Sequence, residues 1–563
     1  DRRLRPRRDI ATCPSARMGD SAAFLSIHKG RTATGTDVMR GIHPQARLIH
    51  LGRQAVFRLA LPGILVVGAL FRLWDIDRPF IGTHAWNEVY YSYIARSFDS
   101  GNLLVQADLL SGGTALSAPI VPWLIYASFK VFGVSEWAAR LPSFLCGMIT
   151  LGVVFALTRN LYGSLVAYVA TLLVSVAPGI VLFSRNAQPE SAMVALGLGA
   201  VLTMVIAQRK SRWAYVLVSF ALFALALLAK YTALLFWPAL AWVWLDYGRS
   251  LGNKRKWAFL SVCTVLSVIP AVACVALMWS ISTTGTQLAP PVEQVLFGKA
   301  PGSAADTSTR ALRYFVRFKE LQLGNLPFAL FSVWGRLEAQ LGAWTWLAGL
   351  FAGVWLLAIA NPRAAAARYS LPMLLTVPWF LPVFLYPYSW LLNEYYTYPA
   401  LYPICICWAV AFVATAKRFP GCQGLPRTGA TLVIAISVGL FLFANLCQYR
   451  AVYRNSYYPR PLASQDDAFY SARLIAELNT AHQPVLADTP LTLYYSGANR
   501  SNGVSVWWWD NQDLLPAIIR TREFVYLVFV YPPPADEMEV ILNSGYERIA
   551  PGAWRLNSAD AGP

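Results

Sequence analysis

The chain has 563 residues, of which 56% are hydrophobic and only 13% charged, and its mean hydropathy is +0.44. A soluble domain carries roughly 25% charged residues, so this composition predicts a protein that lies largely in lipid. The net charge of +18 could indicate nucleic-acid binding. However, the basic residues fall in short clusters between apolar runs, which is typical of topology signals, so nucleic acid is excluded as a partner.

Residues 1–54 are basic and contain no apolar core of 7–15 residues, so they do not read as a secretory signal peptide. We expect this segment to be a disordered cytoplasmic tail. Its arginines concentrate near the start: Arg2, Arg3, Arg5, Arg7, Arg8 and Arg17.

Runs of about 20 apolar residues predict transmembrane helices, and eleven runs follow the tail. Residues 55–447 are therefore expected to form a polytopic helical membrane domain. The predicted spans are Ala55–Leu73, Leu141–Leu157, Leu165–Phe183, Ser191–Ala207, Ala214–Leu228, Ala233–Leu245, Trp257–Trp279, Ala343–Ile359, Leu371–Tyr386, Ala400–Ala416 and Thr431–Cys447.

The distribution of charge supports this topology. With a cytoplasmic start, the linkers that fall inside are rich in Lys and Arg, as the positive-inside rule requires. The short outer linkers, near 184–190, 229–232 and 387–399, hold only Arg185 and Lys230 as basic residues. We therefore expect a multi-pass plasma (inner) membrane protein with these short linkers on the periplasmic or extracytoplasmic side.

The apolar run Pro119–Phe132 does not fit as a span, because it is short and carries Pro122 and Lys130. If it crossed the membrane, the basic linkers would lie on the wrong side, so it is interpreted as a helix in the outer interface. The large outer pieces are then loop 74–140, loop 280–342 and a C-terminal region, 448–563.

The C-terminal region changes composition and predicts a small extracytoplasmic α/β domain, because helical and strand patterns alternate along it. The expected elements are a helix at Asp467–Leu478, a strand at Pro484–Ala487, a helix at Leu514–Arg520, a strand at Phe524–Tyr531, a helix near Asp536–Asn543 and a last strand near Arg548–Arg555.

Four polar clusters lie at the outer ends of the predicted helices, where charge is costly and indicates function. The first is the segment from His84 to Ser97 in the first outer loop. A helix is expected from Glu88 onward, with Asn87 as its N-cap and Glu88 complementing the helix dipole. Capping alone would explain this pair equally well.

The second cluster is the turn 184–190, which places Arg185 and Glu190 at the membrane surface. A hairpin closed by an Arg–Glu pair is the alternative explanation. The third is Lys230, in an outer hairpin between two apolar arms. This lysine could bind a lipid phosphate or could anchor the hairpin to headgroups.

The fourth cluster contains Glu394, Tyr395 and Tyr396 at another outer helix end. An aromatic belt accounts for the tyrosines but not for Glu394. Carboxylates can act as a general base and as an orienting group, while cations can hold a phosphate leaving group. Together, the four clusters favour an enzyme that handles a lipid-linked phosphate.

Several of these motifs resemble the GT-C glycosyltransferases of the protein O-mannosyltransferase and lipid A aminoarabinose transferase superfamily (glycosyltransferase family 39 type). The likeness runs from about Phe57 to Pro403. It is carried by Asn87-Glu88 followed by Ile94-Ala95-Arg96, by Pro119–Leu124, by the run Phe132–Pro142 (FGVSEWAARLP), by Ser184–Glu190 (SRNAQPE), by Ala229-Lys230 and by Tyr395–Pro399.

The resemblance implies that an acidic residue of the first outer loop deprotonates the acceptor hydroxyl, which attacks the sugar with inversion while polyprenyl phosphate leaves. The family's usual pair there is Asp-Glu, and Asn87 stands in place of the Asp. Because an amide cannot act as a base, either Glu88 has taken the role, His84 assists, or the protein is weakened or inactive. We predict Glu88 as the base, with Glu190 as its partner. Glu190 matches the family's second-loop acidic residue.

The resemblance also bears on the lipid phosphate. The lysine that often precedes the Pro119–Leu124 motif falls at Ser117 here. Arg185 and Lys230 thereby become the expected phosphate ligands, with Glu394, Tyr395 and Tyr396 as substrate-binding residues.

We therefore predict a GT-C fold of about 11 transmembrane helices that transfers sugar from a polyprenyl-phosphate donor to a lipid, glycan or protein acceptor of the envelope. The alternative is a polyprenyl-lipid-binding transporter or a non-catalytic envelope-assembly protein. Glu88 and Glu190 could share a divalent cation, but no ligand spacing in the sequence establishes a metal site.

Overall fold

The structure is a computed structural model that describes residues 44–80, 85–98, 118–249, 251, 253–283, 366–385, 394–418, 463–488, 490–498, 503–505, 515–529 and 533–557, with isolated positions between 327 and 447. The chain divides into two compact units, Asp1–Pro62 and Gly63–Pro563, and the candidate site lies within the second. Two expected spans, Ala343–Ile359 and Thr431–Cys447, lie outside the continuously described segments.

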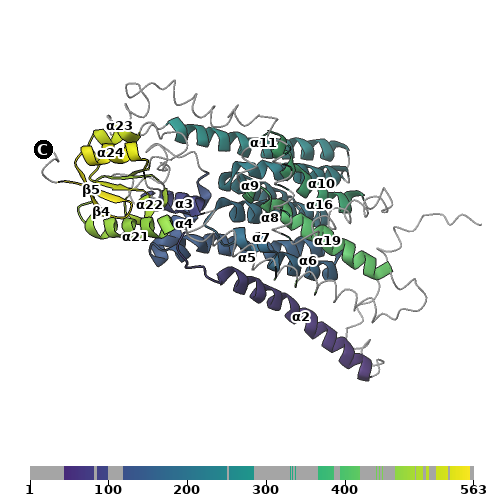
Figure 1. Cartoon of the computed structure of the whole chain (residues 1–563). Helices are drawn as coiled ribbons and strands as arrows, with labels where there is room; N and C mark the ends of the chain where they lie inside the picture. The colour runs from purple at the N-terminus through teal and green to yellow at the C-terminus, as the bar shows by residue number, and fades with distance from the viewer. Residues whose placement is uncertain are drawn as a thin grey trace, which may run out of the picture. The chain divides into compact units, whose positions relative to one another are not determined.

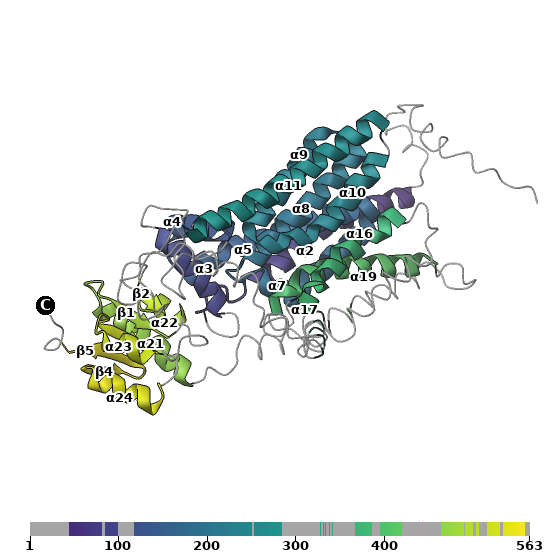
Figure 2. The same cartoon turned by 90° about the horizontal axis from the view of Figure 1, so that it is seen from above.

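The membrane part is built from apolar helices that pack along one another. Contacts join α8 to α9, α9 to α11 and α10 to both α8 and α11, and these four helices run side by side in Figures 1 and 2. The helices of the second unit are α5 (Glu136–Tyr162), α6 (Ser164–Val176), α7 (Pro178–Phe183), α8 (Pro189–Lys210), α9 (Trp213–Ala229), α10 (Trp237–Arg249), α11 (Asn253–Thr283), α16 (Ala366–Thr376), α17 (Pro382–Leu385) and α19 (Tyr398–Arg418). A further apolar helix, α2 (Pro44–Leu73), begins in the first unit.

Two of the described helices, α5 and α8, are by themselves long and apolar enough to cross a membrane. Some of the expected spans are divided into shorter helices because proline interrupts the apolar run. The expected span Leu165–Phe183 is in fact two helices, α6 and α7, and α7 begins at Pro178. Proline lacks the N–H that a continuing helix would use, whereas it is well suited to the first position of a new one.

The expected spans Leu371–Tyr386 and Ala233–Leu245 are also not continuous α-helices. The first divides into α16, the 3₁₀ segment η6 (Val377–Phe380) and α17, with Pro378 and Pro382 at the joints. The second begins as the 3₁₀ segment η3 (Tyr231–Phe236), directly after Lys230, before α10 starts.

The first outer loop contains two helices, α3 (Ala85–Ser97) and α4 (Ile120–Phe132). The bounds of α4 agree with those expected for the interfacial helix. The expectation that Asn87 caps a helix starting at Glu88 is wrong, because α3 begins three residues earlier, at Ala85. Asn87 therefore lies inside the first turn, and its side chain is buried.

The C-terminal part contains a five-stranded sheet of order β2-β1-β3-β5-β4. Strands β1 and β2, and β1 and β3, are parallel, whereas β5 pairs antiparallel with both β3 and β4. The elements are α21 (Ala463–Leu478), β1 (Val485–Ala487), α22 (Pro490–Tyr495), β2 (Gly503–Ser505), α23 (Leu515–Arg520), β3 (Tyr526–Val528), α24 (Ala535–Asn543), β4 (Tyr546–Ala550) and β5 (Ala553–Leu556).

Helices cover both faces of this sheet, because side chains alternate between the faces along each strand. Leu486 and Leu527, at the centres of β1 and β3, pack in one cluster with residues of α23 and α24. Val485 and Val528, their neighbours in sequence, pack in the other cluster, which includes residues of α21 and α22. The unit is thus a small three-layer α/β/α arrangement (Figure 1).

The expected last strand, Arg548–Arg555, is in fact a hairpin of two strands, β4 and β5. The chain reverses at Pro551-Gly552, where Gly552 has φ +74°. A Cβ there would lie 2.5 Å from the Phe529 carbonyl oxygen, so only glycine fits the turn. Helix α22 and strand β2 were not expected from the sequence, because each is too short to show a periodic pattern.

Candidate active site

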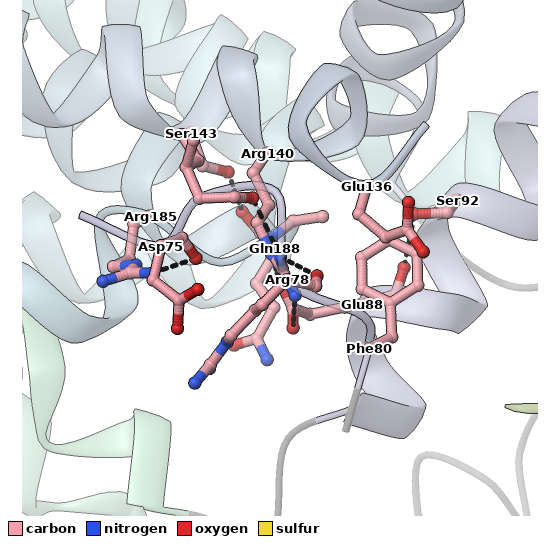
Figure 3. Close-up of polar contacts among 12 residues, drawn as sticks. Asp75, Arg78, Phe80, Glu88, Ser92, Glu136, Arg140, Ser143, Arg185 and Gln188 are labelled. Carbon is pink, nitrogen blue, oxygen red and sulfur yellow. Dashed lines mark hydrogen bonds and ion pairs between the residues drawn. The ribbon is translucent and has the colours of Figure 1, made fainter. Parts of the chain in front are cut away.

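A buried ion pair between Glu88 on α3 and Arg140 on α5 lies at the centre of the candidate site (Figure 3). The guanidinium binds the carboxylate through two hydrogen bonds, with Arg140 Nε 2.8 Å from Glu88 Oε1 and Nη2 3.0 Å from Oε2. Each residue is about 1% exposed. Such bidentate geometry gives the strongest and most directional pairing available to a carboxylate.

The pair also holds together three segments that are distant in sequence. Arg140 Nη1 donates to the carbonyl oxygens of Ile76 (2.9 Å) and Arg78 (2.5 Å), in the first outer loop. Glu88 Oε1 accepts a third hydrogen bond, from the Ala187 backbone N–H at 3.1 Å. Helix α3, the start of α5 and the turn before α8 therefore share one polar centre.

The pKa of Glu88 is lowered by this environment. Burial alone would raise the pKa, but the charge and hydrogen bonds of Arg140, the charge of Arg78 and the Ala187 N–H together outweigh it. Each of these partners stabilises the carboxylate form. Glu88 is consequently ionised at neutral pH, and its carboxylate is a weak base.

The turn between α7 and α8 is fixed against α5. Ser143 on α5 donates from its hydroxyl to the Gln188 carbonyl oxygen (3.2 Å), and Ser191 donates to the Ser143 carbonyl oxygen (2.8 Å). Gly147 permits this contact, since a Cβ there would lie 2.7 Å from Ser184 Cβ. Arg185, 1% exposed, donates to the Asp75 carbonyl oxygen at 2.6 Å.

Lys230, at the end of α9, is the cation of a second cluster. Its ammonium pairs with Glu190 Oε1, and the two side chains are 14% and 3% exposed. The ammonium also lies 4.4 Å from the centre of the Tyr395 ring and 5.5 Å from that of Tyr396, both in the segment η7 (Glu394–Tyr396). A carboxylate and the faces of aromatic rings both attract the positive charge of a lysine ammonium.

Similar proteins were found by sequence and by structure. Residues 117–279 match the family described as dolichyl-phosphate-mannose-protein mannosyltransferase. ArnT from Cupriavidus metallidurans, solved with bound undecaprenyl phosphate, superposes with a TM-score of 0.58 at 16% identity and covers 89% of this chain and 98% of its own.

The oligosaccharyltransferase AglB from Archaeoglobus fulgidus, solved with an inhibitory peptide and a dolichol-phosphate, superposes with a TM-score of 0.53 at 12% identity. That match covers 83% of this chain and 69% of AglB. No curated protein sequence matches the chain.

This chain has the GT-C fold. The resemblance that the motifs indicated is thereby confirmed, by a family match and by solved GT-C glycosyltransferases. The GT-C fold implies a helical membrane protein, in agreement with the composition.

The structure brings together several of the residues singled out from the sequence. Glu88 contacts the turn that carries Arg185, through Ala187, and Glu190 contacts Lys230. The ion-pair partner of Glu190 is thus Lys230 and not Arg185, as a simple closed hairpin would have required. His84 and the side chain of Glu394 lie outside the described residues.

Sequence reasoning did not identify Arg140 as part of this centre. Arg140 appears only as one letter of the motif run Phe132–Pro142. Its importance could have been predicted, because an arginine one residue before a predicted span is energetically costly unless it is paired. The local sequence, however, does not indicate that its partner is Glu88, which is 52 residues away on another helix.

The two acidic residues do not form a divalent-metal site together. The Glu88 carboxylate is bound by Arg140 through both oxygens, and Glu190 Oε1 is bound by Lys230. Within the described segments no three His, Cys, Asp or Glu side chains gather as metal ligands would. No chemical step is therefore assigned to a metal at these residues.

Proposed function

We propose that this protein is an inverting glycosyltransferase that moves a sugar from a polyprenyl-phosphate donor to an envelope acceptor on the outer face of the membrane. The observation that supports this most strongly is Lys230, held by Glu190 and by Tyr395 at a helix end within a GT-C fold. A shielded cation at a helix end suits a lipid phosphate. ArnT and AglB were each solved with such a lipid.

Lys230 and Arg185 are the proposed ligands of the donor phosphate. Both are cationic, and both extend from short turns at the same ends of α8 and α9 as the Glu88 centre. As the bond between the sugar and the phosphate breaks, negative charge grows on the phosphate. Cations fixed in advance stabilise that charge without reorganising, which is the largest single source of catalysis in such reactions.

Glu190 is the better candidate for the general base, and Glu88 for a positioning residue. Both oxygens of Glu88 are engaged by Arg140 and its pKa is lowered. Glu190 has its Oε1 on Lys230, whereas its Oε2 has no hydrogen-bond partner among the described residues. That second oxygen can accept a proton, while Asn87 cannot act as a base.

In the proposed reaction, Glu190 takes the proton of the acceptor hydroxyl as its oxygen attacks the anomeric carbon of the sugar. The bond from that carbon to the phosphate oxygen breaks, and the electron pair leaves with the polyprenyl phosphate. Attack from the face opposite the leaving group inverts the anomeric centre. Tyr395 and Tyr396 would pack against the substrate beside Lys230.

A reconstituted sugar-transfer assay tests the proposal. The full chain in lipid nanodiscs is given undecaprenyl-phosphate hexoses and pentoses, together with a lipid, glycan or peptide acceptor. The glycosylated acceptor and the released undecaprenyl phosphate are both measured by mass spectrometry. Glu190→Gln and Lys230→Met should each lower kcat at least 100-fold. Lys210→Met is the matched control, because Lys210 also contacts a tyrosine ring, Tyr215, but at the other end of α8.

The same protein in sealed proteoliposomes separates this proposal from lipid transport. A transporter would move a fluorescent polyprenyl-phosphate sugar between leaflets without breaking the bond between the sugar and the phosphate. Leaflet exchange by wild type with no sugar transfer to any acceptor would refute the glycosyltransferase proposal.

A further inference from the structure

The side chain of Gln188 is buried, and its amide makes no hydrogen bond in the part of the chain that the structure describes. Gln188 is 1% exposed, and neither Nε2 nor Oε1 has a partner. Buried amides are nearly always hydrogen-bonded, so an amide with both atoms unmet requires an explanation.

Helix capping does not explain why the Gln188 side chain is buried. Gln188 occupies the N-cap position of α8, with φ −136° and ψ 155°, yet its side chain makes no capping hydrogen bond. Its backbone is fixed on both sides, since its N–H donates to the Asn186 carbonyl oxygen at 2.7 Å and its carbonyl accepts from Ser143. The position from which the Gln188 side chain extends is therefore fixed by these two hydrogen bonds.

Gln188 also lies beside the groups that carry the proposed chemistry. The preceding residue, Ala187, donates its N–H to Glu88, and Figure 3 shows Gln188 next to Arg78 and the Glu88–Arg140 pair. Two residues further along, Glu190 is 2% exposed, and its Oε2 is also without a partner in the described segments. An unmet amide and an unmet carboxylate oxygen thus flank Pro189, in one turn.

We propose that Gln188 is a specificity-determining residue whose amide hydrogen-bonds a hydroxyl group of the bound sugar. This inference rests on the proposed function and adds the group that distinguishes one sugar from another. A hydroxyl both donates and accepts, which matches an amide that offers one N–H₂ and one carbonyl oxygen. A phosphate only accepts, so it would satisfy Nε2 but would be repelled by Oε1.

The hydroxyl could belong to the sugar on the donor lipid or to a sugar acceptor. In either case its loss should be costly, because a site built around a hydrogen bond discriminates against an analogue that lacks the partner group. We expect a preference of about 10- to 100-fold, the range of one lost hydrogen bond in a buried site.

The test uses the full chain in nanodiscs and measures affinity without requiring turnover. The ligands are undecaprenyl phosphate, undecaprenyl-phosphate mannose and glucose, and a glycan acceptor, together with the monodeoxy analogues of each sugar. Wild type should bind at least one intact sugar lipid about 10- to 100-fold more tightly than one of its deoxy analogues. Gln188→Met, which keeps the side-chain length, should bind the two equally and should bind bare undecaprenyl phosphate as wild type does.

The matched control is Gln208→Met, on the same helix. Gln208 donates to Asp246 Oδ2 at the other end of α8, so its loss should leave every affinity ratio unchanged. Gln188→Glu provides a second variant if the first does not fold. It keeps the size and the one acceptor oxygen but replaces the N–H₂ donor by a second oxygen, and it should also lose the preference for the intact sugar.

Each outcome is decisive. Equal discrimination by wild type and Gln188→Met, against deoxy donors and against deoxy glycan acceptors, would overturn the inference. A change confined to the affinities of deoxy donors assigns the hydroxyl to the donor, and a change confined to the affinities of deoxy glycan acceptors assigns it to the acceptor. Sugar discrimination that depends on Gln188 in a protein without transfer activity would refute the proposed function and leave this inference standing.

Discussion

At the scale of single residues, the Glu88–Arg140 pair determines how the first outer loop is held. Removing one member of a buried ion pair leaves an uncompensated charge and typically costs about 3–5 kcal/mol. Replacing both members by uncharged residues costs much less, because no charge then remains buried. Comparing the single and double variants can therefore distinguish a positioning role of Glu88 from a direct role in the reaction.

We expect Glu88→Gln and Arg140→Met each to lower the unfolding free energy by about 3 kcal/mol or more. The double variant should be more stable than either single variant. If Glu88 only positions the loop, the double variant should also recover part of the transfer activity. Thermal unfolding and sugar transfer, measured on all four proteins, check this. A double variant as stable as wild type but without any activity would instead assign Glu88 a direct role.

The lowered pKa of Glu88 predicts a dependence of stability on pH. Because the pKa in the folded protein lies below the ordinary value of 4.5, the unfolded chain takes up the proton first as pH falls. The contribution of the pair is therefore fully present above about pH 5 and is lost as pH falls below 4.5 through the folded pKa. The stability difference between wild type and Glu88→Gln should shrink over that acidic range and stay constant between pH 6 and 8. A difference that grew on acidification would contradict the assignment.

A site residue could be predicted from the sequence only where its immediate neighbours in the chain mark it as unusual. Glu190 and Lys230 were identified because each interrupts an otherwise apolar hairpin. Their pairing with each other was not, because it depends on how α8 packs against α9. The sequence also could not show that the Gln188 amide has no hydrogen-bond partner in the described residues, since this depends on the folded turn.

At the scale of elements, the short helix α22 fastens the C-terminal sheet to the first outer loop. The Tyr495 hydroxyl accepts from the Phe80 N–H at 2.9 Å and donates to Glu136 Oε1 at 3.0 Å. Arg96, on α3, donates to the carbonyl oxygens of Tyr494 (3.0 Å) and Ala498. The helix that carries Glu88 is thus held from both α5 and α22.

The Tyr495 hydroxyl is suited to this role because it stays protonated. Its pKa is raised by burial and by the nearby negative charge of Glu136, so it remains a donor across the physiological range. The pKa of the neighbouring Tyr494 is likewise raised, to about 12, mainly by burial. Neither ring is expected to titrate during catalysis.

Tyr495→Phe removes one hydroxyl and leaves both of its partners unmet. We expect a loss of about 1–3 kcal/mol in unfolding free energy and a several-fold fall in kcat with little change in donor affinity, because α3 would be less firmly held. Tyr546→Phe is the matched control, since the Tyr546 hydroxyl donates within the C-terminal sheet, to the Phe524 carbonyl oxygen. An equal fall in kcat in both variants would show that α22 has no specific effect on α3.

At the scale of the whole molecule, the proposed reaction requires the sheet and the Glu88 centre to face the outside. Charge distribution predicts this orientation. A cysteine placed at Asn543, exposed at the end of α24, should react with a membrane-impermeant maleimide on intact cells, in a variant whose native cysteines are replaced. A cysteine at Ser211, exposed after α8, should react only after permeabilisation. The reverse pattern would place the site on the cytoplasmic side.

The sequence by itself determined the membrane character of the protein and the positions of many helices. Apolar run length and composition are local properties, so the bounds expected for α4 agree with those observed. The same local information failed where proline divided a span into α6 and α7, and where the chain reversed between β4 and β5. In both places one or two residues override a longer pattern.

Only the tertiary structure decided which charges are partners. Glu88 and Arg140 are 52 residues apart, and Lys230 and Glu190 are 40 apart. Ion pairing depends on distance in space, and burial strengthens whichever partner the packing of helices brings close. The sequence could therefore indicate that Glu88 and Glu190 matter, while the fold alone distinguished a carboxylate held by an arginine from one with an oxygen available for chemistry.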